Sequence, residues 1–169
     1  RDLGVFFYWA PAKTRKLFSS LVRDGLKGSG DYGVFGLGVY NGQTANRPEL
    51  NNNRHVVTRL SYPFQFRNQI VEPGLQAYSG LWEMPKGSLS PGVKTNETLN
   101  YRDERLAASL IVYPKPFGIQ AEYNIGRGPE FNKFTDSIET SILQGGYITA
   151  SYFFKIKNQF LNPEFFLAV

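Results

Sequence analysis

The stretch Phe117–Ile125 (FGIQAEYNI) alternates strictly between apolar and polar or small side chains. Apolar residues take the odd positions, whereas Gly118, Gln120, Glu122 and Asn124 take the even ones. Strict alternation predicts a β-strand with two unlike faces, because successive side chains of a strand point to opposite sides. The apolar face of such a strand packs either on a protein core or against a lipid bilayer.

The same alternation recurs along most of the chain and predicts about eight strands of roughly nine to twelve residues. Tilted strands of that length are long enough to cross a bilayer. The expected fold class is therefore all-β, an antiparallel β-barrel domain, or a portion of one, over residues 1–169. The expected strands are Leu3–Ala10, Tyr32–Gly42, His55–Phe64, Pro73–Trp82, Arg105–Tyr113, Phe117–Ile125, Gly145–Lys157 and Phe160–Val169.

One segment, Lys13–Gly28, has the periodicity of a helix instead. Leu17, Leu21 and Val22 share one helical stripe, Thr14 is placed to cap the start, and the final glycine is placed to end the helix. We therefore expect a short amphipathic helical insertion between the first two strands.

The connections between the expected strands differ in length. The segment Tyr113–Gly118 is a short turn, whereas Asn41–Asn53, Glu83–Asp103 and Gly126–Thr140 are long and polar. If the strands run up and down, the short turns lie at one end of the sheet and the long loops at the other. Outer-membrane barrels have this asymmetry, so it favours a transmembrane barrel.

Aromatic residues near the ends of the expected strands also favour a membrane barrel, because they resemble the girdles at the two bilayer interfaces. Alternation alone leaves a soluble ligand-binding β-barrel open, since soluble all-β domains alternate as well. The aromatic residues expected in the girdles are Trp9, Tyr40, Tyr62, Phe64, Trp82, Tyr113 and Phe117.

The composition argues against several other function classes. The chain has no cysteine and one histidine, His55, which we expect at a strand end near the interface. We therefore expect no metal and no cofactor. The adjacent carboxylates Asp103 and Glu104 would point to opposite sides of a strand, so we expect no acid–base catalysis and no enzyme activity. The 19 lysines and arginines are scattered, so a nucleic-acid partner is not expected.

A family resemblance is carried by five segments: Arg1–Val5, Tyr32–Gln43, Arg54–Phe64, Gly74–Gly80 and Leu110–Phe131. The last segment (LIVYPKPFGIQAEYNIGRGPEF) is the most specific of them. Together they resemble the phosphate-selective porin O and P family of Gram-negative bacteria. The resemblance implies a roughly sixteen-stranded outer-membrane barrel, usually a homotrimer, that conducts small anions such as phosphate. About eight strands are half of such a barrel, and a barrel in lipid must close, so we expect this chain to be part of a longer one.

In an anion channel, fixed positive charges along a narrow path lower the barrier for anions, and arginine suits this role because it stays charged and binds oxyanions with two donors. An arginine in the lumen can instead pair with a carboxylate such as Glu122, and the barrel can instead be a non-conducting accessory subunit of an outer-membrane assembly. The pore-lining candidates are Arg59, Gln120, Glu122, Asn124 and Lys155, and the pore-mouth candidates are Arg105 and Arg127.

Overall fold

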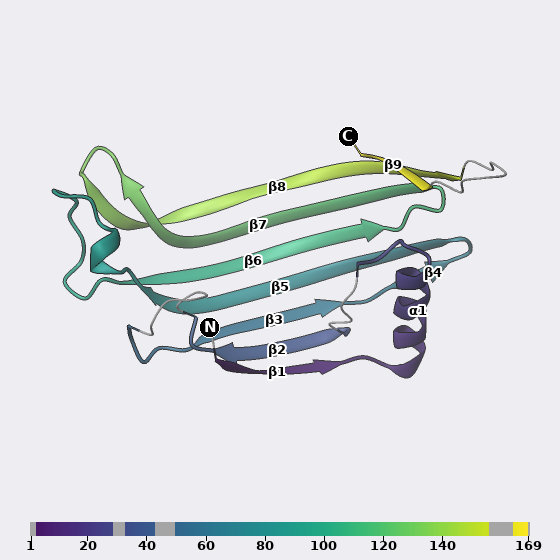
Figure 1. Cartoon of the computed structure of the whole chain (residues 1–169), viewed down its shortest axis with the longest axis horizontal. Helices are drawn as coiled ribbons and strands as arrows, with labels where there is room; N and C mark the ends of the chain where they lie inside the picture. Colours follow the sequence, from purple (N-terminus) through teal and green to yellow (C-terminus); the bar gives the residue numbers. More distant parts are fainter. Residues whose placement is uncertain (1–2, 29–32, 43–49, 156–163, 169) are drawn as a thin grey trace.

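The computed structural model describes residues 3–28, 33–42, 50–155 and 164–168. They form one antiparallel β-sheet with a single α-helix, α1 (Ala12–Arg23), and a short 3-10 turn at Lys86–Ser88 (Figure 1). The predicted all-β class is confirmed. The strands are β1 (Gly4–Trp9), β2 (Phe35–Tyr40), β3 (His55–Ser61), β4 (Phe64–Phe66), β5 (Gln69–Glu83), β6 (Asn100–Val112), β7 (Phe117–Asn132), β8 (Ser137–Lys155) and β9 (Glu164–Ala168).

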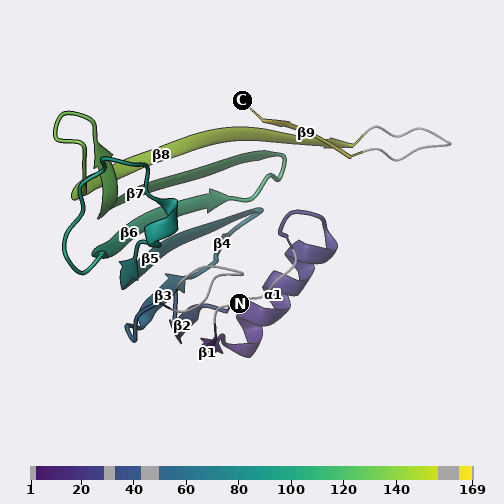
Figure 2. The ribbon, with the colours of Figure 1, turned by 60° about the vertical axis from the view of Figure 1, so that its left-hand side comes forward.

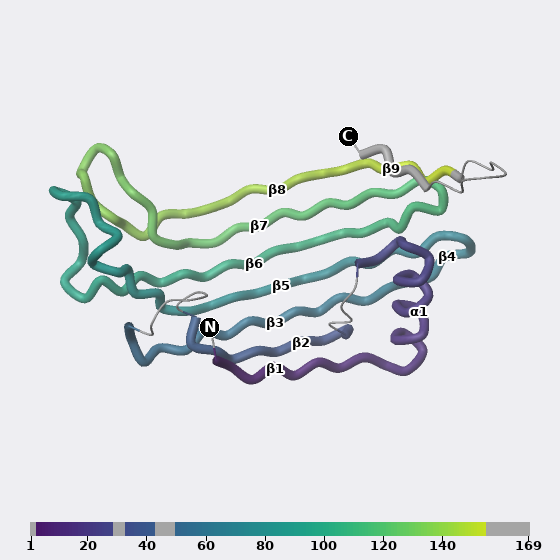
Figure 3. The backbone as a smooth tube through the Cα atoms, in the orientation of Figure 1, coloured from purple at the N-terminus to yellow at the C-terminus, as the bar shows by residue number. Residues whose placement is uncertain are grey.

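The strands follow one another in chain order across the sheet, β1-β2-β3-β5-β6-β7-β8-β9, and the short β4 pairs only with β5. Figure 3 shows the backbone running up and down between the two ends of the sheet. Among the described strands, β1 and β9 are the two edges and do not pair with each other. The described sheet is therefore open and is not closed into a barrel.

The pairing register gives the sheet two chemically different faces. In β7 and β8, Ala121 lies opposite Ile148, whereas the next residue, Glu122, lies opposite Tyr147. We call the side that bears Ala121 the apolar face and the side that bears Glu122 the polar face. Neighbouring strands continue both faces. The apolar face includes Val5, Phe7, Leu37, Val39, Val56, Leu60, Leu75, Leu106, Leu110, Ile125 and Ile148.

The apolar face is open to its surroundings rather than packed on a core. Val5 is 79% exposed and Ile148 is 78% exposed. The buried apolar side chains that pack together are instead a small cluster of Phe18, Leu21, Ile70 and Tyr113. The other buried apolar side chains in the described residues are Val34, Leu99 and Tyr101. The long strands are thus held together mainly by their backbone ladders and cross-strand pairs.

Aromatic side chains gather on the apolar face at the end of the sheet that carries the short turns. The rings of Tyr62 and Phe64 lie 4.9 Å apart and those of Phe64 and Phe66 6.2 Å apart, between centroids. Trp9 and Phe117 lie at the same end. The expectation was wrong for Tyr40, Trp82 and Tyr113, because the register places them on the polar face.

Helix α1 starts one residue before the expected segment Lys13–Gly28 and ends five residues before its last residue. The reason is Gly25, whose φ of 70° is in the left-handed region. Its N–H donates to the carbonyl of Val22, and the N–H of Leu26 donates to the carbonyl of Leu21. This pair of bonds is a Schellman motif, which satisfies the last helical carbonyls and stops the helix.

Helix α1 packs on the polar face at the short-turn end of the sheet, and Figure 2 shows the sheet curving around the side on which the helix lies. Phe18 and Leu21 from the helix contact Ile70 of β5 and Tyr113, the residue after β6. No helix in the described part of the chain is long and apolar enough to cross a membrane. The helix is therefore a cover over one end of the polar face.

The expected long loop Gly126–Thr140 is mostly strand. β7 continues to Asn132 and β8 begins at Ser137, so only a four-residue turn separates them. Arg127 and Pro129 take the next two positions where the alternation requires apolar residues, which hid the strand from the sequence pattern. The backbone ladder continues past them with polar pairs. The first part of the expected last strand, Phe160–Val169, lies outside the described residues, whereas residues 164–168 form β9.

Candidate functional site

A buried carboxylate on the polar face, Glu72 of β5, is the centre of the candidate site. Glu72 is 1% exposed, and protein groups bind both of its oxygens. Its Oε1 accepts hydrogen bonds from Arg59 Nη2 at 3.3 Å and from Ser61 Oγ at 2.9 Å. Its Oε2 accepts from Lys27 Nζ at 2.9 Å and from the hydroxyl of Tyr113 at 2.5 Å. A carboxylate with this many donors is held rigidly in its charged form.

The charges around Glu72 do not cancel. One carboxylate lies between two cations, so the group of Lys27, Arg59 and Glu72 carries one net positive charge. The Arg59 side chain keeps 29% of its surface exposed on the polar face, whereas the Lys27 side chain keeps 15%. The excess charge is therefore presented to solvent through Arg59.

Aromatic contacts fix Lys27 in place. Its Nζ lies 4.5 Å from the ring centroid of Phe18 and 5.6 Å from that of Tyr113, which are favourable cation–π distances. Burial, and then the hydrogen bond to Glu72, raise the pKa of the Tyr113 phenol above its ordinary value. The phenol thus stays protonated and donates to Glu72, in the turn between β6 and β7.

Glu72 is not among the site residues expected from the sequence, because the expected strand begins at Pro73. In the structure β5 begins at Gln69 and runs through Pro73, whose carbonyl accepts the N–H of Tyr62 at 3.2 Å. Glu72 also meets Lys27 across 45 residues of sequence, so no local pattern joins them. The sequence does contain one signal for Glu72. Glu72 and Gln76 both occupy even positions, so an extended strand places them on the same face.

A row of polar side chains crosses the polar face from Arg59. Arg59 lies opposite Gln76, whose Nε2 donates to Ser109 Oγ at 3.0 Å. Ser109 lies opposite Glu122, and Glu122 lies opposite Tyr147. Five neighbouring strands, β3, β5, β6, β7 and β8, therefore contribute to one hydrophilic surface.

The other pore-lining candidates extend the same surface. Gln120 donates from Nε2 to the hydroxyl of Tyr147 at 3.0 Å. Asn124 lies between Ala107 of β6 and Gly145 of β8 in the register. Lys155 lies in β8 opposite Glu164 of β9, and its side chain is outside the described part of the structure. Arg59, Gln120, Glu122 and Asn124 thus share one face.

The two pore-mouth candidates lie on opposite faces of the sheet. Arg105 is on the polar face and binds Asp103 with two hydrogen bonds, of 2.9 and 3.3 Å. Arg127 is on the apolar face, opposite Ile142, because β7 continues past the position where the sequence pattern placed its end. Arg127 is two residues after Ile125 in the same strand, so its side chain lies on the same apolar face and points away from the polar face.

His55, expected near an interface, is 1% exposed on the polar face. One ring nitrogen lies 2.6 Å from the Tyr78 hydroxyl and the other 3.1 Å from the carbonyl oxygen of Leu81. Gly42 and Gly80 lie against the ring, and a side chain at either position would collide with it. Within the described residues, no group of three or more acidic or histidine side chains is placed to hold a metal ion.

No protein family, curated protein or solved structure matches this chain. The resemblance to the phosphate-selective porins therefore stays a prediction from the quoted segments.

Proposed function

We propose that this sheet is part of the wall of an outer-membrane β-barrel porin, and that its polar face lines a water-filled path for small anions such as phosphate. One observation carries the proposal: large apolar side chains are exposed across the sheet on one face, while the opposite face bears the polar row. Soluble monomers rarely expose contiguous apolar patches beyond a few hundred Å². Lipid is the solvent that suits such a face.

The height of the apolar face supports this proposal. From Phe117 to Ile125 the apolar alternation in β7 is unbroken. Eight steps at about 3.3 Å per residue extend roughly 26 Å along the strand, which is roughly 20 Å of height at a tilt of about 40°. The outward apolar band of outer-membrane barrels is about 25 Å tall and is flanked by aromatic girdles. The aromatic group of Tyr62, Phe64 and Phe66 occupies the girdle position at the short-turn end.

The open edges of the sheet support a larger assembly. Unpaired backbone groups are costly in lipid, so β1 and β9 each require a neighbouring strand there. We propose that further strands complete the barrel, to roughly sixteen by the family resemblance, and that the barrels form trimers.

Anion preference is supported by the charges of α1. The helix has four basic residues, Lys13, Arg15, Lys16 and Arg23, and no acidic residue. In a closed barrel its position on the polar face would place it inside the lumen at the short-turn end. A narrow path lined by fixed positive charge concentrates anions and repels cations. Arg59 would add its excess charge beside the helix.

The same helix favours one alternative, a non-conducting barrel that acts as an accessory subunit, because a helix in the lumen can close the path. Conductance of the purified protein in planar bilayers separates the two. We expect discrete conductance steps and, under a potassium chloride gradient, a reversal potential of the anion-selective sign. Absence of steps would favour the accessory barrel, and a cation-selective sign would overturn the anion preference. A protein that stays monodisperse without detergent would contradict both and favour a soluble barrel.

A further inference from the structure

A charged cluster interrupts the apolar face at the end of the sheet that carries the long connections. Arg102 and Glu104 of β6 meet Arg127 of β7 there. Glu104 accepts from Arg102 Nη1 at 2.9 Å, from Arg127 Nε at 2.9 Å and Nη2 at 2.7 Å, and from Ser79 Oγ at 3.2 Å. One carboxylate thus orients two guanidinium groups.

The two arginines keep an excess positive charge and N–H donors that Glu104 does not use. The three side chains carry one net positive charge, and those of Arg102 and Arg127 are 59% and 54% exposed. Within the described part of the chain, Glu104 is the only side-chain partner of either guanidinium. Each guanidinium has five N–H groups, so most of these donors stay available. Glu83, the next acidic residue on this face, lies opposite Asn100 and further toward the connection between β5 and β6.

The cluster borders the apolar face directly. Leu106 and Ile125, which lie opposite each other, are the next residues on this face below Glu104 and Arg127. Beside them lies a hollow of about 470 Å³. On this face its lining residues are Ser79, Glu104, Leu106, Ile125, Arg127 and Ile142. The hollow is therefore apolar at one end, and at the other it carries the ion pair of Arg127 and Glu104.

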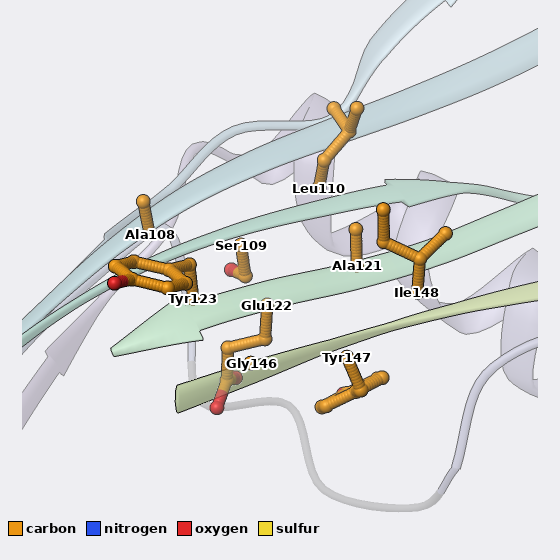
Figure 4. A pocket seen from close by; sticks show the side chains of 9 residues that line it. All are labelled: Ala108, Ser109, Leu110, Ala121, Glu122, Tyr123, Gly146, Tyr147 and Ile148. Atoms are coloured by element: carbon orange, nitrogen blue, oxygen red, sulfur yellow. The ribbon is translucent and has the colours of Figure 1, made fainter. Parts of the chain in front are cut away.

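A second hollow continues down the same two strands and β8. Its volume is about 640 Å³, and on the apolar face Ala108, Leu110, Ala121, Tyr123 and Ile148 line it. Figure 4 shows the side chains of Leu110, Ala121 and Ile148 on one side of the sheet and those of Glu122 and Tyr147 on the other. Gly146, Ala108 and Ala121 have no side chain or a short one, so the surface is hollowed between the larger neighbouring side chains. The two hollows share no lining residue but follow one another along β6 and β7, and we call them together the groove. Arg127 lines the end of the groove that bears the charged cluster.

We propose that this groove binds one anionic lipid, with a headgroup phosphate on Arg102 and Arg127 and an acyl chain along the two hollows. Guanidinium groups bind phosphate oxygens with paired, charge-assisted hydrogen bonds, which suits the exposed donors. The groove accounts for the rest of the ligand, because a free phosphate would leave it empty. The inference rests on the membrane placement proposed above, and it places the headgroup layer at the level of Arg127.

Native mass spectrometry of the detergent-solubilised protein tests the proposal. The probes are phosphatidylglycerol and phosphatidylcholine with identical acyl chains, each with and without millimolar inorganic phosphate. We expect phosphatidylglycerol to bind at least tenfold more tightly than phosphatidylcholine. We also expect Arg127→Gln to remove that preference, and inorganic phosphate to compete only weakly because it makes no contact with the groove.

Two variants provide controls. Arg105→Gln removes the same charge from the polar face and should leave phosphatidylglycerol binding unchanged. Ala121→Trp fills the larger hollow without touching the arginines and should weaken the binding of both lipids. Equal phosphatidylglycerol affinity in Arg127→Gln and Arg105→Gln would overturn the lipid site. Full displacement by inorganic phosphate would also overturn it, because the ligand would then be a free anion.

The proposal about the lipid and the proposal about the porin fail in different ways. A protein that conducts in planar bilayers but shows no phosphatidylglycerol preference loses only the lipid site. A protein that is monodisperse without detergent loses the membrane placement, and the lipid site with it.

Discussion

At the scale of single residues, Glu72 joins the helix to the sheet. Its carboxylate is buried and takes donors from the segment after α1, from β3 and from the turn after β6. Removing one partner of a buried pair leaves an uncompensated charge and costs about 3–5 kcal/mol. The position of α1 on the polar face should therefore depend strongly on this one side chain.

Glu72→Ala is expected to release the segment that follows α1. Lys27 and Arg59 would then face each other without a carboxylate, so Lys27 should leave its place between Phe18 and Tyr113. Limited trypsin digestion of the detergent-solubilised protein measures this as faster cleavage after Lys27. Glu122→Ala is the matched control, because Glu122 lies on the same face and makes no ion pair with another described residue. Equal cleavage rates in the two variants would contradict the role of Glu72.

Arg59→Ala should shift the reversal potential toward the cation-selective direction. The change removes the exposed cation of the Glu72 group and leaves Lys27 and Glu72 as a neutral pair. Arg59→Lys keeps the charge and should keep most of the anion preference. A reversal potential that is the same in Arg59→Ala and in the unchanged protein would remove Arg59 from the conduction path.

At the scale of elements, alternation identified where most strands lie but not how far they extend. The alternation located β7 from Phe117 but not its continuation past Ile125. Arg127 and Pro129 break the apolar pattern there without breaking the backbone ladder. The alternation also predicted that Arg105 and Arg127 line the same pore mouth. In the register Arg127 lies opposite Glu104, the residue before Arg105, so the two arginines lie on opposite faces. The contact of α1 with the polar face had no local signal, because it joins Phe18 to Ile70 and Tyr113.

Phe18 and Leu21 are the buried apolar side chains of α1, so Phe18→Ala with Leu21→Ala should undock the helix. Each truncation of a buried large side chain costs about 2–5 kcal/mol. With the strands intact by circular dichroism, single-channel conductance should rise, because the helix no longer narrows the path. Val22→Ala, at an exposed position of the same helix, is the control and should leave conductance unchanged. A double variant that conducts like the Val22→Ala protein would place α1 outside the path.

An added charge should lower the free energy of unfolding much more at one residue of β8, Ile148, than at its neighbour Thr149. Ile148→Lys places an ammonium on the apolar face, where a lipid-facing charge near the middle of the bilayer costs about 2–4 kcal/mol. Thr149→Lys places the same charge on the polar face and should cost little. Urea unfolding of both variants in lipid vesicles compares the two free energies of unfolding. Similar losses at both positions would show that the two faces do not meet different solvents.

At the scale of the whole molecule, the porin proposal requires the apolar face of the sheet to contact lipid. A soluble barrel would turn that face inward as a core, whereas the described sheet leaves it exposed and keeps α1 on the polar side. Sequence alternation could establish that two faces exist, but the same pattern fits both solvents. The register separates the two faces, and helix α1 lies on the polar one.

The absence of cysteine from the chain allows one direct measurement. Single cysteines are placed at successive positions from Ile119 to Asn124 in the protein reconstituted into lipid vesicles, and their rates of reaction with a charged, water-soluble maleimide are compared. We predict fast labelling at Gln120, Glu122 and Asn124, and slow labelling at the odd positions between them. Fast labelling at the odd positions, equal to that at the even ones, would contradict the lipid-facing assignment and the porin proposal built on it.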